Sequence, residues 1–149
     1  MEVKIILGVA AVLFEIASAI LYYRDIWRGN TKPHLYTMLV WSIVSGITFA
    51  GLVVGGAKAG AWATGFAFLQ VASLSIISLK WGTTDITRSD KLFLVAALFT
   101  VVPWILTKNP LWSIILASVI DSCGIVPTLR KTWRAPKTES LGAWLLALL

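Results

Sequence analysis

Two long stretches without a charged residue restrict the folds open to this chain more than any other feature. Residues 35–57 and 60–79 contain no aspartate, glutamate, lysine or arginine. A helix needs about 20 apolar residues to cross the hydrocarbon core of a bilayer. Charged residues make up 13% of the 149 residues, whereas soluble domains carry roughly 25%. The sequence therefore predicts an all-α integral membrane protein.

Further apolar runs extend this prediction along the chain. The candidate spans are 3–23, 35–57, 60–79, 92–108 and 111–130, and the fourth is short and contains Pro103. A sixth run begins at Ser140, and ten residues remain from there to the last residue. We expect about five full spans and the start of a sixth, in a chain truncated at its C-terminus.

Lysines and arginines predict the orientation in the membrane. The connections within 24–34, 80–91 and 130–139 contain ten of them, and the opposite side contains Lys4, Lys58 and Lys108. The positive-inside rule assigns the richer side to the cytoplasm. We therefore expect a multi-pass protein of the cell inner (plasma) membrane with its N-terminus outside. The basic residues lie between apolar runs, where they fix the orientation of membrane spans. We therefore expect the lipid bilayer as partner and no binding of nucleic acid.

An Arg-x-x-Trp-Arg corner occurs twice, 106 residues apart, as Arg24, Trp27, Arg28 and as Arg130, Trp133, Arg134. Twelve residues before each tryptophan stands an acid within a predicted span, Glu15 or Asp121. This shared register predicts a parallel internal repeat. The corners themselves are typical interfacial anchors, and the alternative is a gate at the cytoplasmic mouth.

The stretch "VPTLRKTWRAPKTESLGAW" has a helix-ending proline, Pro127, a basic turn and then Ser140 before the next helix. It resembles the loop motif of the SWEET and PQ-loop superfamily, although Thr128 stands where the family has its eponymous glutamine. The resemblance implies two three-helix units joined by a linker helix, in a 3+1+3 order. Residues 1–82 would form the first unit, 83–109 the linker helix, and 110–149 the incomplete second unit.

Polar residues within the spans are the candidate site. An ionised carboxylate at membrane depth costs about 2.5–3.5 kcal/mol on insertion scales. Two roles are therefore open for Glu15 and Asp121. They either face a cavity, where they bind a proton, a cation or a solute, or they form hydrogen bonds or ion pairs where two helices pack together.

Trp41 and Ser45 share one helical face, which lines a pocket or packs against a neighbouring helix. Ser122 adjoins Asp121. The resemblance implies that a polar residue of the third helix contacts substrate, and Gln70 is the nearest candidate.

The predicted function is a transporter or facilitator of a small polar solute, sugar-like or vitamin-like, that works by alternating access. In one form of this hypothesis, Glu15 and Asp121 couple the transport of the solute to the movement of protons. The alternative is a non-transporting receptor or assembly protein of the same fold, and a homo-oligomer is compatible with either. The sequence contains no recognisable catalytic set, so we expect no enzyme activity, no cofactor and no metal.

Overall fold

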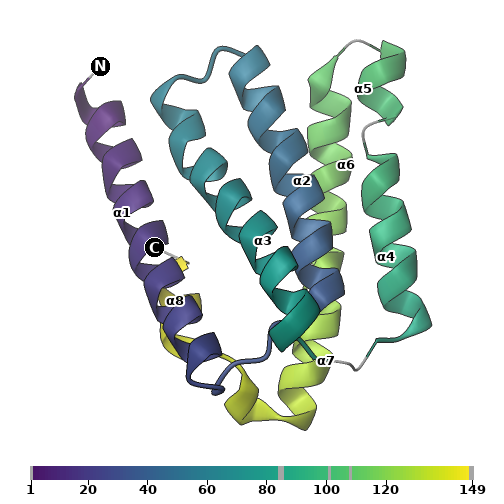
Figure 1. Ribbon diagram of the computed structural model, residues 1–149. Coiled ribbons are helices and arrows are strands. Elements are labelled where there is room, and N and C mark those ends of the chain that lie inside the picture. Colours follow the sequence, from purple (N-terminus) through teal and green to yellow (C-terminus); the bar gives the residue numbers. More distant parts are fainter. Residues whose placement is uncertain (1, 84–85, 101, 108, 148–149) are drawn as a thin grey trace.

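The computed structural model describes residues 2–83, 86–100, 102–107 and 109–147, and this part of the chain is helical without any strand. The α-helices are α1 (Glu2–Trp27), α2 (Leu35–Val54), α3 (Trp62–Trp81), α4 (Arg88–Phe99), α5 (Val102–Thr107), α6 (Pro110–Gly124), α7 (Val126–Arg134) and α8 (Leu141–Ala147) (Figure 1). Two short 3-10 turns, η1 (Ala59–Ala61) and η2 (Pro136–Thr138), precede α3 and α8. The predicted all-α class is confirmed.

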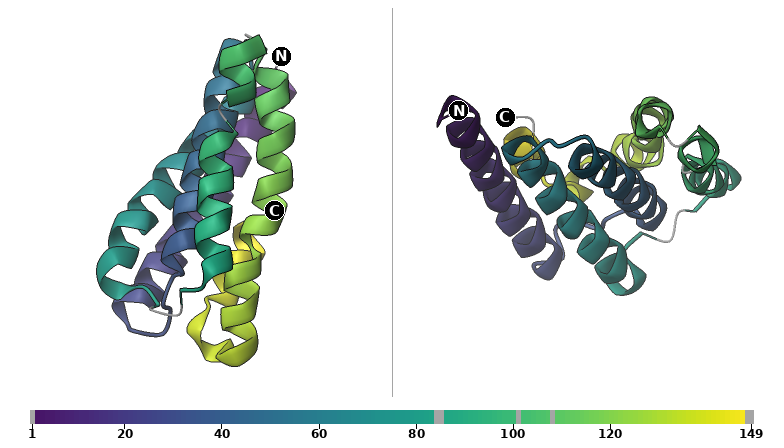
Figure 2. Two further views of the ribbon diagram at one scale, coloured as in Figure 1. Left: turned by 90° about the vertical axis from the view of Figure 1, so that its right-hand side faces the viewer. Right: turned by 90° about the horizontal axis from the view of Figure 1, so that it is seen from above.

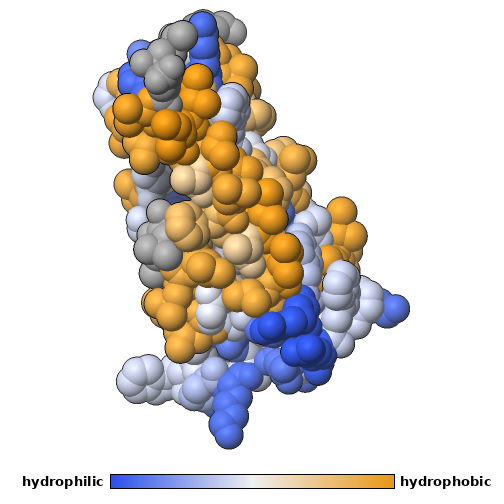
Figure 3. All heavy atoms as spheres, turned by 90° about the vertical axis from the view of Figure 1, so that its left-hand side faces the viewer, coloured by the Kyte–Doolittle hydropathy of each residue, from blue (hydrophilic) through white to orange (hydrophobic). Residues whose placement is uncertain are grey.

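Three segments are long and apolar enough to cross a membrane: Val3–Trp27, Leu35–Val54 and Ala59–Trp81. Large apolar side chains are exposed along them, among them Leu7, Leu13, Leu69 and Ile76. On the side of the molecule that carries α1, a broad hydrophobic band covers the middle of the surface (Figure 3). Such a surface is suited to lipid, because soluble monomers rarely expose large contiguous apolar patches. These features indicate a membrane protein.

The predicted fourth and fifth spans are each divided between two shorter helices. The fourth becomes α4 and α5, with Pro103 as the second residue of α5. The fifth becomes α6 and α7, with Pro127 as the second residue of α7 and a break at Ile125. Proline lacks an amide hydrogen and its ring clashes with the preceding turn, so it is favoured at a helix start.

The helices form a curved layer in which α3 lies between α1 and α2 (Figures 1 and 2). On the other side of α2 lie α6 and α4, and α8 packs against α1. Two clusters of buried apolar residues hold this layer together. One joins α1, α2, α3 and α8, the other joins α2, α4 and α6, and Trp41 packs against both. Trp41 therefore stands at the junction of the two cores.

One end of the bundle collects most of the basic residues, and we call it the basic end. There α1 and α3 end, and α2, α4 and α8 begin (Figure 1). Figure 3 shows hydrophilic residues gathered at this end. The antiparallel course of α1, α2 and α3 brings the connections within 24–34 and 80–91 to this end, and α7, which carries Arg130, lies there as well (Figure 1).

Gly82 lies where two connections meet at the basic end, and the surrounding backbone leaves no room for a side chain there. The Thr83 amide donates a hydrogen bond to the Pro33 carbonyl oxygen at 3.0 Å. A Cβ atom on Gly82 would lie 2.9 Å from that oxygen, and closer still to the carbonyl oxygen of Ser78. Both neighbours are backbone atoms, so a side chain can be accommodated only by moving the chain.

We predict that Gly82→Ala lowers the thermal unfolding temperature of the detergent-solubilised protein, because overpacking costs about 1–3 kcal/mol. The matched control is Gly60→Ala, since a Cβ atom on Gly60 meets nothing within 4 Å. Far-UV circular dichroism during heating measures both variants. Equal unfolding temperatures for the two would contradict the prediction.

Candidate functional site

A pocket of about 150 Å³ lies between α1, α2, α3 and α8, and we call it the central pocket. Three of the residues expected from the sequence to bind solute line it: Glu15, Trp41 and Gln70. Each comes from a different helix that is long and apolar enough to span a membrane. Glu15 and Gln70 both lie near the middle of their helices, so the pocket reaches halfway along the bundle.

Helical spacing brings further side chains of α1 to this pocket. Ser18 and Tyr22 follow Glu15 by three and seven residues and lie on the same helical face. Both line the pocket, and both are almost fully buried. The Ser18 hydroxyl donates to the carbonyl oxygen of Ala143 at 2.8 Å, which fastens α8 to α1. One face of α1 thus supplies an acid, a hydroxyl and a phenol.

Tyr22 and Trp144 line the pocket on its side towards the basic end. The Tyr22 hydroxyl and the Trp144 indole nitrogen each donate to Oε2 of Glu139 at 3.2 Å. The two rings meet edge to face, with their centroids 6.4 Å apart and their planes at 86°. Trp144 also meets Trp41 at 5.4 Å and 72°. Glu139 therefore fixes two of the three rings that surround this end of the pocket.

Glu139 is held by a buried ion pair with Lys131 of α7. Their side chains are 7% and 6% exposed. The Lys131 ammonium donates to Oε1 of Glu139, to the Lys32 carbonyl oxygen at 2.6 Å and to the Thr138 carbonyl oxygen at 3.2 Å. A lysine ammonium has three protons to donate, so all three are used. This network joins α7 and η2 to the connection between α1 and α2.

A second pocket of about 260 Å³ lies between α7 and α8, beyond Trp144. Thr128, Leu129 and Glu139 contribute to its lining. Trp144 lines both this pocket and the central one. The two cavities thus share one wall residue, the indole ring that Glu139 holds.

Asp90 forms another buried polar cluster at the basic end. Its carboxylate is fully buried and accepts two hydrogen bonds from Arg130, at 3.3 and 3.0 Å, and one from the Thr87 amide at 2.7 Å. His34 Nε2 lies 3.5 Å from Asp90 Oδ2, and His34 Nδ1 accepts from the Thr37 amide. Burial alone would raise the pKa of Asp90, but the hydrogen bonds from Arg130 and Thr87 hold that pKa below its ordinary value.

Three candidate residues lie outside the central pocket. Ser45 is partly buried one turn beyond Trp41 on α2. Asp121 and Ser122 are exposed on α6, where the Ser122 hydroxyl donates to the Ser118 carbonyl oxygen at 3.0 Å. The structure therefore does not bring Asp121 and Glu15 together around this cavity.

The two Arg-x-x-Trp-Arg corners both lie at the basic end, yet their arginines differ. Trp27 and Trp133 are 72% and 90% exposed, and Arg24 forms an exposed pair with its neighbour Asp25. Arg130, in contrast, binds the buried Asp90. The last arginine of each corner, Arg28 or Arg134, is exposed, and Pro127, ahead of the second corner, is buried.

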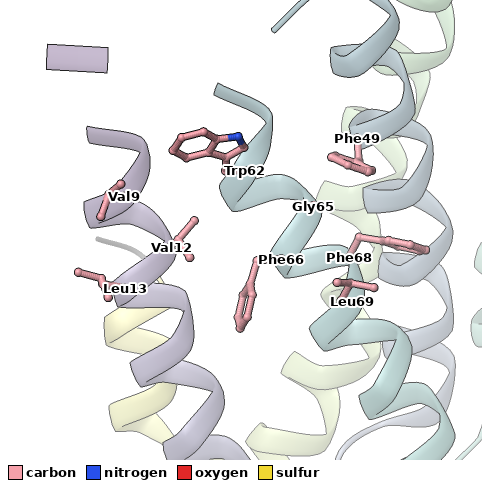
Figure 4. Close-up of a pocket in the computed structure, with 9 residues that line it drawn as sticks. All are labelled: Val9, Val12, Leu13, Phe49, Trp62, Gly65, Phe66, Phe68 and Leu69. Atoms are coloured by element: carbon pink, nitrogen blue, oxygen red, sulfur yellow. The ribbon is translucent and has the colours of Figure 1, made fainter. Parts of the chain in front are cut away.

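A larger groove of about 540 Å³ opens between α1 and α3, in the half of the bundle remote from the basic end. Its lining carries no charged side chain and no hydroxyl, carboxamide or carboxyl group. Figure 4 shows its walls, formed by Val9, Val12 and Leu13 on α1, Phe49 on α2, and Trp62, Gly65, Phe66, Phe68 and Leu69 on α3. A few placed polar groups normally orient a solute in a binding site, and among the described lining residues of this groove the Trp62 indole nitrogen is the one polar side-chain atom.

The sequence prediction missed Tyr22, Trp144 and Glu139. Tyr22 could have been found from its spacing to Glu15, because it lies seven residues further along the same helix. Glu139 offered no such signal, since it stands in a connection that reads as surface. Its partners Tyr22 and Trp144 come from opposite ends of the chain.

No group of three histidine, cysteine, aspartate or glutamate side chains that could hold a metal occurs among the described residues. Comparison with protein-family models, with curated proteins and with solved structures found no match. The residues of the site itself are therefore the basis for a proposed function.

We predict that Asp90→Asn destabilises the protein at neutral pH by about 3 kcal/mol, because removing one partner strands the other charge of a buried pair. Thermal unfolding in detergent measures the difference between wild type and variant. The charged Asp90 stabilises the fold above its ordinary pKa of about 3.9, and this contribution is lost as the pH falls through the lowered pKa of the folded state. The difference should therefore shrink below about pH 4. A difference that stays constant down to pH 3 would contradict this account.

Proposed function

We propose that this chain is a membrane transporter or facilitator of a small polar solute, which binds in the central pocket. The observation that carries the proposal is the joint position of Glu15, Trp41 and Gln70 in one cavity deep among three apolar helices. Ionisable residues in such helices are rare, and they typically mark pathways for ions or substrates. A structural role alone would not require a cavity beside them.

The hydrogen-bonded rings towards the basic end support a gated pathway. Trp144 lines both the central pocket and the second pocket, and Glu139 holds its indole through a hydrogen bond. Release of Glu139 from Lys131 would free Trp144 and Tyr22 at the same time. Reversible opening of the Lys131–Glu139 pair is the step that we propose for solute exchange at this end.

The resemblance to the SWEET and PQ-loop superfamily belongs to the same proposal. In it, α1, α2 and α3 form the first three-helix unit, and α4 with α5 corresponds to the linker helix. The helices α6 to α8 begin the second unit. The basic end would face the cytoplasm and the N-terminus the outside, in accordance with the positive-inside rule.

Uptake into proteoliposomes tests the proposal. We expect at least one solute from a panel of sugars, vitamins and small amines to enter protein-containing vesicles faster than empty ones. Glu15→Gln and Trp41→Ala should lower the initial rate at least tenfold, because both residues line the pocket.

Asp121→Asn is the matched control, since Asp121 is an acid of a predicted span that is exposed outside the pocket. We expect less than a twofold change in its uptake rate. Equal losses in Glu15→Gln and Asp121→Asn would contradict the proposed site. Specific solute binding without any flux would favour the receptor alternative.

A further inference from the structure

The charged groups around the central pocket indicate which charge its ligand has. Among the described residues that line the pocket, Glu15 is the one acid or base that is charged near neutral pH, because the phenol of Tyr22 is neutral there. Among the described residues, no lysine, arginine or histidine forms an ion pair with Glu15, whereas Asp90 and Glu139 each have such a partner. A carboxylate within an apolar bundle is stabilised by a positive charge, and the part of the chain that the structure describes supplies none to Glu15.

Aromatic rings surround the same cavity. Trp144 meets Tyr22 at 86° and Trp41 at 72°, so that the three rings form adjoining walls. The faces of aromatic rings attract cations, and quaternary ammonium groups are recognised by cages of such rings. An acid beside an aromatic cage is suited to an organic cation.

The hydrogen-bonding groups of the pocket argue against a ligand rich in hydroxyl groups. The Ser18 hydroxyl already donates to Ala143, and the Tyr22 hydroxyl and Trp144 indole already donate to Glu139. The Trp41 indole nitrogen lies against Gly124 of α6. The donor hydrogens of Ser18, Tyr22 and Trp144 are therefore engaged, although the two hydroxyl oxygens can still accept. Of the hydrogen-bond donors in the lining, the Gln70 amide remains for a ligand, which is few for a sugar, whereas an amine needs acceptors such as the Glu15 carboxylate.

We propose that the central pocket binds a small organic cation, with its ammonium group between the Glu15 carboxylate and the rings of Tyr22, Trp41 and Trp144. This inference rests on the proposed function and narrows its solute class. The volume of about 150 Å³ corresponds to about five water molecules at about 30 Å³ each. A cation of the size of choline is therefore a suitable probe.

Isothermal titration calorimetry of the detergent-solubilised full chain tests the proposal, with choline and its uncharged carbon isostere 3,3-dimethylbutanol as probes. We expect choline to bind at least tenfold more tightly than the isostere, because only choline carries the charge. This comparison uses the wild-type protein and needs no variant. Equal binding of the two probes, or no binding of choline, would overturn the proposal.

Variants assign the charge effect to Glu15. Glu15→Gln should weaken choline binding at least tenfold, and Glu15→Asp should retain most of it because the charge remains. Asp121→Asn, the exposed acid on α6, should bind choline like the wild type. Unchanged affinity in Glu15→Gln, or an equal loss in Asp121→Asn, would overturn the assignment.

The uptake experiment distinguishes this inference from the proposed function. Choline binding that depends on Glu15, without flux, would support the cation site and contradict transport. Flux of an uncharged solute that depends on Trp41, without choline binding, would support transport and contradict the cation site.

Discussion

The buried ion pair between Lys131 and Glu139 is the interaction on which the central pocket depends. Taking two charges out of water is unfavourable unless their remaining hydrogen bonds are also made. Here the ammonium is bound by two backbone carbonyl oxygens as well, and the carboxylate accepts from Tyr22 and Trp144. Because every partner is supplied by a different segment, the pair holds α8 in position and so forms one wall of the pocket.

The pair between Asp90 and Arg130 has a similar role on the other side of α2. It joins the start of α4 to α7, and His34 at the start of α2 lies beside it. A hydrogen bond between the hydroxyls of Thr128 and Thr37 adds a second link between α7 and α2. Neighbouring residues of α7, Arg130 and Lys131, thus tie this short helix to α4 and to the connections at the basic end.

Much of the first half of the fold could be predicted from the sequence, because uncharged runs of about 20 residues leave few alternatives to a membrane-spanning helix. Glu15, Trp41 and Gln70 could be selected as polar or aromatic interruptions of such runs. Asp121 meets the same criterion, but the face of α6 that packs on α2 carries Ala117 and Ile120. Asp121 is therefore exposed. Its spacing of twelve residues from Trp133 could not predict this, because the spacing does not say which face of α6 packs on α2.

The polar clusters at the basic end could not be predicted, because their members are distant in sequence. Asp90 and Arg130 are separated by 40 residues, and Tyr22 and Glu139 by 117. Pairing of this kind depends on how the helices pack, not on any local pattern. The same holds for Trp144, which appeared in the sequence only as part of a short apolar segment.

Solvent access to Ser18 is the most direct test of the central proposal, in which Glu139 holds Tyr22 and Trp144 across the pocket and so closes it. Ser18 is 3% exposed and lines the cavity behind Tyr22 and Trp144. A Ser18→Cys reporter, in a chain whose natural cysteine is replaced by Cys123→Ser, should react slowly with a water-soluble thiol reagent. Adding Glu139→Gln should increase that rate at least tenfold, while the thermal unfolding temperature verifies that the chain remains folded. Equal rates in the presence and absence of Glu139 would contradict the claim that this carboxylate closes the pocket.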